Sequence, residues 1–297
     1  MPKQEMAEQV RNANGFIAAL DQSGGSTPKA LKAYGIGEDA YATDDEMFDL
    51  IHGMRSRIVD APAFTGAKVI GAILFEMTMD RTFGGKPAAR YLWEDRRVVP
   101  FLKIDKGLEA EVDGVQLMKP IPGLEDLLRR ATENGVFGTK MRSVIYAVSQ
   151  SGIAANVAQQ FQIGKEVISH GLVPILEPEI NIKMTGKAEA EEILRDAILA
   201  ELDQLAPNAT IMLKLTLPEI PNIYKPLVDH PQVMRVVALS GGYSRAEANR
   251  RLAENTGVVA SFSRALTEGL SAQQSDAEFN TMISETIEDV FAASVAG

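Results

Sequence analysis

Eight short apolar runs recur along almost the whole chain, and helical patterns lie between many of them. The runs are rich in Val, Ile and Leu and lack the strict polar alternation of a half-exposed sheet, which is typical of buried parallel strands. Eight such strands with intervening helices predict a (β/α)8 TIM barrel, and an open doubly wound sheet is the alternative. The runs cover residues 15–20, 68–75, 98–104, 136–142, 172–176, 210–215, 233–239 and 258–262.

A chain of 297 residues fits one large barrel, and no linker or internal repeat divides it. Thr43 precedes three acidic residues and an apolar stripe, a pattern that predicts a capped helix. The segment 276–293 has Phe279 and Ile283 on one side and predicts a terminal helix. We therefore expect a single barrel domain over residues 1–297 that carries a C-terminal helix.

The charge and the residue types exclude several classes of function. A net charge of −10 argues against nucleic acid as a partner, although a local basic cluster can still bind a small anionic substrate. The chain has no Cys, which excludes disulfides and thiolate metal sites. His52, His170 and His230 lie far apart in sequence, so we expect no metal site and no cofactor.

The apolar runs are also too short to cross a membrane. The first fifteen residues are polar and lack the apolar stretch of a secretory signal, so we expect a cytoplasmic protein with no membrane partner. The sequence gives no indication of the oligomeric state.

Chemistry in such barrels is found at the C-terminal ends of the strands, which here carry several charged residues. Side chains two apart on a strand face the same way, so Lys214 shares a face with Met212 and Thr216. Leu213 and Leu215 would then pack on the helices, and Lys214 would point into the barrel. Desolvation and a neighbouring cation both favour the neutral amine that Schiff-base chemistry needs.

Two other strand ends supply candidate partners for Lys214. Lys140 and Arg142 share one face, and Glu177 and Glu179 share another. Lys140 is a candidate for the neighbouring cation, and either glutamate is a candidate for proton transfer. The alternative is that both lysines simply form salt bridges with the two glutamates, since buried ion pairs also perturb lysines.

Turns that contain glycine or serine follow three of the predicted strands. Ser240, Gly241 and Gly242 follow the seventh, and Ser263 with Arg264 follows the eighth, where barrels often bind phosphate through backbone N–H groups. The turn from Ser23 to Ser26 follows the first strand, with Lys106 expected nearby. A simple tight turn is the alternative for each of them taken alone, but two such sites on one rim favour a bisphosphate.

The sequence resembles the class I fructose-1,6-bisphosphate aldolases of the short bacterial type. The matching segments cover strands one and three to eight in the order of that family, and EPEI, LSGG and the lysine of strand six are specific in combination. They read FIAALDQSGGS, KIDKG, GTKMRSV, VPILEPEI, MLKLTLP, LSGGYS and SFSRAL.

The resemblance implies reversible cleavage of fructose 1,6-bisphosphate to dihydroxyacetone phosphate and glyceraldehyde 3-phosphate, with no metal or other cofactor. It implies a Schiff base on Lys214, acid–base chemistry by Glu177 and transfer of the C4 hydroxyl proton by Asp21. Lys140 and Glu179 would assist carbinolamine formation and dehydration. The implied substrate contacts are Arg142 and Lys106, with Ser240, Gly241, Ser263 and Arg264 at the 1-phosphate and Ser23 and Ser26 at the 6-phosphate.

The sequence departs from the animal members of that family at two places. They carry an arginine after the lysine matched by Lys29, where this chain has Ala30. They end in a tyrosine that reaches the active site, whereas no tyrosine follows Tyr243 here, so Glu177 is the candidate for the proton transfer at the enamine carbon. The alternatives are another Schiff-base aldolase, such as one for tagatose bisphosphate, and a phosphosugar-binding barrel without lyase activity.

Overall fold

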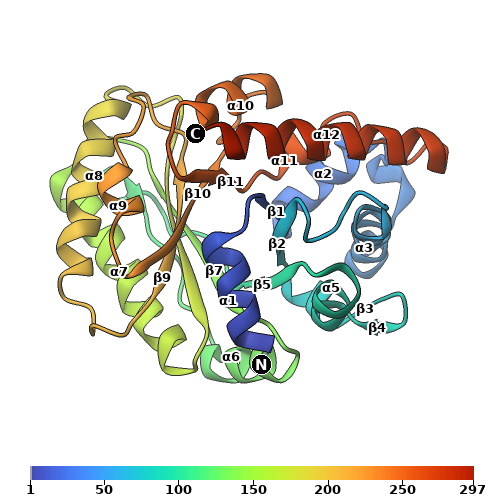
Figure 1. Cartoon of the computed structure of the whole chain (residues 1–297), viewed down its shortest axis with the longest axis horizontal. Coiled ribbons are helices and arrows are strands. Elements are labelled where there is room, and N and C mark those ends of the chain that lie inside the picture. Colours follow the sequence, from blue (N-terminus) through green and yellow to red (C-terminus); the bar gives the residue numbers. More distant parts are fainter. Residues whose placement is uncertain (1) are drawn as a thin grey trace.

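The computed structural model describes residues 2–297 and contains eight parallel strands that form most of one sheet (Figure 1). Neighbours along the sheet follow the order β1-β2-β5-β7-β8-β9-β10-β11, which is the order of the chain. The two end strands approach each other, and the N–H of Ala19 donates to the carbonyl of Phe262 at 3.2 Å. The sheet is therefore a nearly closed barrel with its seam between β1 and β11, as the sequence predicted, and the open sheet is excluded.

All eight predicted strands are present, and the largest differences from the predicted bounds are in three of them. Strands β7 and β8 extend three and four residues beyond the predicted ends, whereas β11 is shorter. The bounds are β1 Phe16–Leu20, β2 Val69–Leu74, β5 Val99–Lys103, β7 Gly138–Ile145, β8 Val173–Ile180, β9 Ile211–Thr216, β10 Val233–Leu239 and β11 Val258–Ala260. Three short strands lie outside the barrel order: β3 Thr82–Phe83, β4 Lys86–Pro87 and β6 Val115–Gln116.

Helices connect the strands and cover the outside of the barrel. The helix capped by Thr43 is α3, and its capping box with Glu46 is formed as the pattern indicated. The α-helices are α1 Pro2–Asn12, α2 Thr27–Ala33, α3 Asp44–Asp60, α4 Glu76–Met79, α5 Ala88–Arg96, α6 Leu124–Glu133, α7 Gln150–Ser169, α8 Lys187–Leu202, α9 Lys225–Val228, α10 Arg245–Ala253, α11 Arg264–Thr267 and α12 Asp276–Ala296. Two 3₁₀ turns are η1 Gly24–Ser26 and η2 Glu38–Ala40.

Two apolar clusters account for the stability of this arrangement. The larger one lies between the outer faces of the strands and the surrounding helices, and α12 contributes Phe279 and Ile283 to it. The smaller one fills the barrel interior with side chains such as Ile17, Phe101 and Met212. The interior is thus a packed core below the polar residues at the C-terminal strand ends.

The polar N-terminal segment forms α1, a helix that the sequence pattern did not predict. Met6 and Val10 of this helix are buried in the interior cluster and Ala7 packs against it, too few apolar side chains to give a clear stripe in the sequence. The guanidinium of Arg235 donates to the carbonyls of Val10 and Ala13 and fixes the end of the helix. Helix α1 therefore covers the N-terminal end of the barrel, opposite the candidate site.

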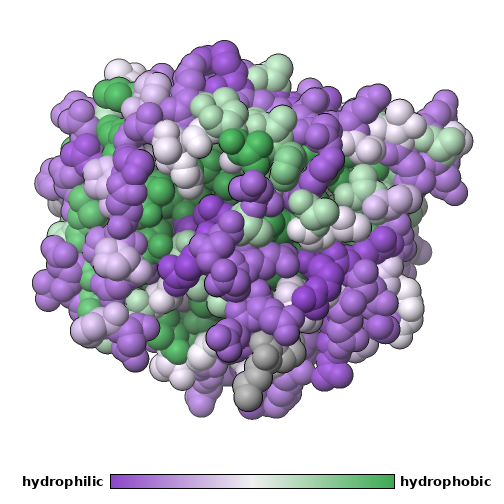
Figure 2. All heavy atoms as spheres, viewed as in Figure 1, coloured by the Kyte–Doolittle hydropathy of each residue, from purple (hydrophilic) through white to green (hydrophobic). Residues whose placement is uncertain are grey.

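Polar side chains cover most of the face that Figure 2 shows, with smaller apolar patches between them. Among the described residues, no helix is both long and apolar enough to cross a membrane.

Candidate active site

Lys214 lies inside the barrel on β9, as the strand alternation predicted. It is 4% exposed, and Met212, two residues earlier, belongs to the interior cluster. The hydroxyl of Thr216, two residues later, bonds both the N–H and the carbonyl of Ile180 on β8. These neighbours fix the strand on both sides of Lys214 and hold its amine at the C-terminal end of the interior core.

Glu177 on β8 is shared between two lysines. Its Oε1 lies 3.1 Å from Nζ of Lys214, and its Oε2 lies 2.9 Å from Nζ of Lys140 on β7. Lys140 also lies 2.6 Å from Oδ2 of Asp21, which directly follows β1. The four side chains form one continuous chain of charges across the barrel mouth, Lys214–Glu177–Lys140–Asp21.

Burial and pairing shift the pKa values of this cluster in opposite directions. Burial alone would raise the pKa of Asp21, but Lys140 and Lys214 outweigh it and hold that pKa well below its usual value. Burial alone would lower the pKa of Lys140, but Asp21 and Glu177 raise it above its usual value. Lys140 and Asp21 are therefore both ionised at neutral pH.

Glu179 faces a different partner from the one that the salt-bridge alternative assumed. Its carboxylate accepts a hydrogen bond from Nε of Arg142, and it forms no ion pair with Lys140 within residues 2–297. Burial opposes the charge of Arg142, but Glu179 raises the pKa of that guanidinium. The other pairings of that alternative, both lysines with Glu177, are present in this structure.

Two residues near Lys140, the half-buried Lys103 and the buried Asp105, were missed in the sequence. Lys103 ends β5, and its Nζ lies 2.7 Å from Oδ1 of Asp105, whose other oxygen lies 3.9 Å from Nζ of Lys140. Both belong to the segment KIDKG, and their two-residue spacing on one strand face was the available signal. Lys106 instead points to the rim, where its Nζ lies 2.6 Å from Oε2 of Glu76.

The turn after β10 and the arginine after β11 lie together. Gly241 and Gly242 have φ of 60° and 122°, and a Cβ on Gly242 would lie 3.4 Å from Nη2 of Arg264. Arg264 is exposed and forms no hydrogen bond or ion pair through its side chain in the described part of the chain. Its guanidinium is thus available beside the N–H groups of the glycine turn, an arrangement suited to an anion.

The turn after β1 is built by its own serines. The hydroxyl of Ser26 donates to the carbonyl of Ser23 at 2.8 Å and accepts from the N–H of Ser23 at 2.9 Å. Ser26 and Gly25 are exposed, and Ser23 is half-buried. This turn and the Arg264 turn flank the β1–β11 seam, one on each side.

Replacing Gly241 with Ala should weaken binding of an anionic substrate. A side chain at φ 60° is strained by about 1–2 kcal/mol, and its Cβ would lie 2.6 Å from Cγ2 of Ile182. We expect KM for the substrate to rise at least several-fold. Gly257→Ala is the matched control, because it has φ 78° and a contact of 2.7 Å with Val228 but precedes β11 at the opposite end. Equal KM values in the two variants would contradict the assignment of the Gly241 turn to an anion site.

The carboxylates of the barrel mouth surround an ammonium group. Asp21, Asp105 and Glu177 all approach Nζ of Lys140, which takes the position where a bound cation would balance them. Within residues 2–297, no group of three or more His, Asp or Glu side chains is placed to hold a metal ion.

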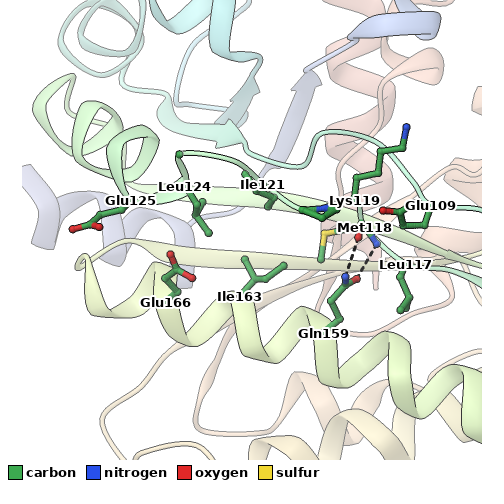
Figure 3. Close-up of a pocket in the computed structure, with 12 residues that line it drawn as sticks. Glu109, Leu117, Met118, Lys119, Ile121, Leu124, Glu125, Gln159, Ile163 and Glu166 are labelled. Atoms are coloured by element: carbon green, nitrogen blue, oxygen red, sulfur yellow. Dashed lines mark hydrogen bonds between the residues drawn. The ribbon is translucent and has the colours of Figure 1, made fainter.

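A separate open hollow of about 720 Å³ lies outside the barrel mouth (Figure 3). Gln159 on α7 bonds both main-chain groups of Met118 along its wall, with distances of 2.8 and 2.9 Å. Its lining includes none of the candidate site residues. It therefore contributes nothing to the site described above.

Fold and site together define a barrel enzyme with a buried lysine in a carboxylate-lined mouth. Residues 4–229 match the model of the fructose-bisphosphate aldolase class-I family. The chain is 59% identical to the class 1 fructose-bisphosphate aldolase of Porphyromonas gingivalis, with 98% of this chain and 99% of the relative covered. It is 56% identical to that of Synechocystis sp., with 99% and 98% covered. The chain therefore belongs to the class I fructose-bisphosphate aldolases, which are lyases.

A solved structure confirms the fold at much lower sequence identity. Fructose-bisphosphate aldolase from Plasmodium falciparum, solved in complex with TRAP and a small-molecule inhibitor, superposes with a TM-score of 0.78 at 19% identity. The match covers 99% of this chain and 95% of that one.

Proposed function

We propose that the chain cleaves fructose 1,6-bisphosphate reversibly to dihydroxyacetone phosphate and glyceraldehyde 3-phosphate through a Schiff base on Lys214. The observation that carries the proposal is the buried Lys214 amine, 3.1 Å from a carboxylate oxygen of Glu177. Its test is release of triose phosphate from fructose 1,6-bisphosphate by the purified chain, measured beside tagatose 1,6-bisphosphate. Preferred cleavage of the tagatose epimer would replace the proposed substrate and leave the chemistry unchanged.

Schiff-base formation begins with attack of the neutral Lys214 amine on the C2 ketone. The carbinolamine oxygen takes one proton from solvent, and Glu177 accepts a proton from the amine and passes it to the departing hydroxyl, so that water leaves and the iminium forms. Lys140 holds the other oxygen of Glu177 and supplies positive charge beside the carbinolamine oxygen. Glu179 assists from the same strand face, held by Arg142, which is itself a candidate substrate contact.

Cleavage then needs a base at the C4 hydroxyl. Asp21 is ionised and lies at the end of β1, across Lys140 from Lys214. It accepts the hydroxyl proton, the C3–C4 bond breaks, and its electrons enter the iminium to give an enamine. Glu177 takes up a proton from solvent and donates it to the enamine carbon, since its carboxyl group already lies at the Lys214 nitrogen.

The two phosphates would occupy the two turns that flank the seam. Ser240, Gly241, Ser263 and Arg264 bind the 1-phosphate, while Ser23 and Ser26 bind the 6-phosphate with Lys106 on the rim near them. Support for the first placement comes from the glycine turn and from Arg264 beside it, whose side chain forms no hydrogen bond or ion pair with residues 2–297. The second rests on exposed turn residues and on Lys106, which would have to leave Glu76.

Two substitutions should separate the phosphate sites. Arg264→Ala removes a charged hydrogen bond, which is worth roughly 1.5–3 kcal/mol, and should raise KM for fructose 1-phosphate and for the bisphosphate by about 10- to 100-fold. Ser26→Ala should raise KM for the bisphosphate alone, by about fivefold, because only that substrate has a 6-phosphate. Steady-state kinetics on both substrates measures the two effects.

Ser26→Thr is the control for the turn, because it keeps the hydroxyl that bonds Ser23. Equal penalties on both substrates in Ser26→Ala would show that the placement of the 6-phosphate is wrong.

Cleavage should not depend on a divalent metal. The iminium on Lys214 withdraws the electrons that a bound zinc ion would otherwise withdraw, and Lys140 occupies the centre of the carboxylates. We expect full activity after exhaustive treatment with EDTA. Loss of cleavage that zinc restores would refute the Schiff-base mechanism.

A further inference from the structure

Arg55 on α3 is a buried cation that the proposed reaction does not use. It is 1% exposed, and neutral oxygens accept its hydrogen bonds. Within residues 2–297 no carboxylate forms an ion pair with it, and its Nε is buried without a partner. Burial is the largest effect and lowers the pKa of Arg55 to about 10, although Asp21 raises it. Burying a guanidinium without a carboxylate partner costs desolvation free energy, so the hydrogen bonds of Arg55 indicate which part of the structure it stabilises.

The guanidinium of Arg55 joins the loops that follow two neighbouring strands. Nη2 donates to the main-chain carbonyl of Gln22, after β1, at 2.5 Å. Nη1 donates to the hydroxyl of Thr78 in α4, after β2, at 2.7 Å. Gln22 lies between Asp21 and Ser23, so Arg55 fixes the backbone that carries a proposed base and a proposed phosphate ligand.

The side chain of Gln22 continues this connection across the seam of the barrel. Gln22 is itself buried, and its Nε2 donates to the hydroxyl of Ser263 at 2.8 Å. Ser263 precedes Arg264 after β11. A second hydrogen bond crosses the seam close to this point, from the N–H of Ala19 in β1 to the carbonyl of Phe262 after β11.

We propose that Arg55 is a positioning residue that acts through Gln22. It fixes the distance between the 6-phosphate turn after β1 and Ser263, the proposed ligand of the 1-phosphate. This inference rests on the proposed function, because it takes Ser263 and Ser23 as phosphate ligands. A bisphosphate binds with high affinity only if both turns keep their separation, since movement of either turn costs ordering free energy on binding. The buried Arg55–Gln22–Ser263 chain sets that separation at the seam, where the strand pairing is incomplete.

Gln22→Met tests the connection without removing a charge. Met is close to Gln in length, and Arg55 keeps its bond to the main-chain carbonyl of residue 22. The hydroxyl of Ser263 loses its donor, so KM should rise about five- to tenfold for both fructose 1-phosphate and the bisphosphate, with kcat changed less than twofold. Arg55→Met should raise KM for the bisphosphate at least as much, and Arg55→Lys should restore part of that loss.

Arg57→Met is the matched control on the same helix. Arg57 donates to the carbonyl of Gln274 at 2.6 Å and pairs with Asp276, so it joins α3 to α12 rather than to the site. We expect a lower Tm in both Arg57→Met and Arg55→Met, and a raised KM only in Arg55→Met. The double variant Gln22→Met with Arg55→Met should raise KM less than the product of the two single effects, because both residues belong to the same hydrogen-bonded connection to Ser263.

Ser263→Ala separates this inference from the proposed function. If Ser263→Ala raises KM while Gln22→Met leaves both KM values within twofold, the connection is overturned and the 1-phosphate site stands. If Ser263→Ala leaves KM unchanged, the 1-phosphate site is wrong and the inference fails with it. Equal KM increases in Arg55→Met and Arg57→Met would reduce Arg55 to a structural residue.

Discussion

Replacing Lys214 with Met is expected to lower turnover by about 10⁴- to 10⁶-fold, the range seen when a nucleophile or its activating partner is removed. No other lysine amine replaces it, because Lys140 is held between Asp21 and Glu177 with a raised pKa. The fold should survive the change. Glu177 keeps its contact with Lys140 at 2.9 Å, so no buried carboxylate is left without a partner.

The measurement is kcat with fructose 1,6-bisphosphate, with the Tm and circular dichroism of each variant as the test of folding. Lys165→Met is the control, because Lys165 lies half-exposed on α7 and its one ion pair with residues 2–297 is to Glu201, at 3.7 Å. A folded Lys214→Met protein that retains more than about 1% of the turnover would contradict the role of this lysine.

Glu177→Gln should slow proton exchange on dihydroxyacetone phosphate by about 10²- to 10⁴-fold, the usual contribution of a general acid–base group. The amide keeps the shape of the side chain and can still accept a hydrogen bond from either lysine, but it cannot exchange a proton. Schiff-base formation should slow as well, because the same carboxylate serves the carbinolamine. Exchange of deuterium from solvent into the triose phosphate measures the effect.

Glu191→Gln is the matched control for this substitution. Glu191 is a fully buried glutamate paired with a buried lysine, Lys187, but it lies on α8 outside the barrel interior. The Glu191→Gln protein should exchange deuterium into dihydroxyacetone phosphate at the same rate as the unsubstituted protein. If Glu177→Gln also retains the full rate, another group performs the proton transfer, and Asp21 is the next candidate.

The eight strands and the direction of Lys214 could be predicted because both depend on local spacing. Parallel strands buried on both faces are continuous apolar runs, and a two-residue repeat then decides which side chains point inward. The same repeat paired Lys140 with Arg142 and Glu177 with Glu179 as candidate partners of Lys214, and the structure brings Lys140 and Glu177 to the barrel mouth.

The remaining features depend on contacts between distant segments. Glu179 pairs with Arg142 rather than with Lys140, a choice that the stagger between β7 and β8 decides and that spacing within one strand does not contain. Helix α1 was missed because few apolar side chains, chiefly Met6 and Val10, attach it to the barrel end. Arg55 lies in the helix that follows Thr43, and the role of its guanidinium depends on the path of the loop after β1, whose carbonyl at Gln22 it bonds.

The most direct test of the central claim is borohydride reduction in the presence of dihydroxyacetone phosphate, followed by peptide mass spectrometry. The mechanism predicts a stable addition with the mass of the reduced triose phosphate on Lys214, and none on Lys140, Lys103 or Lys106. Omitting the triose phosphate or using Lys214→Met should abolish the addition. An unmodified Lys214, or the addition on Lys140 in its place, would contradict the mechanism proposed for this site.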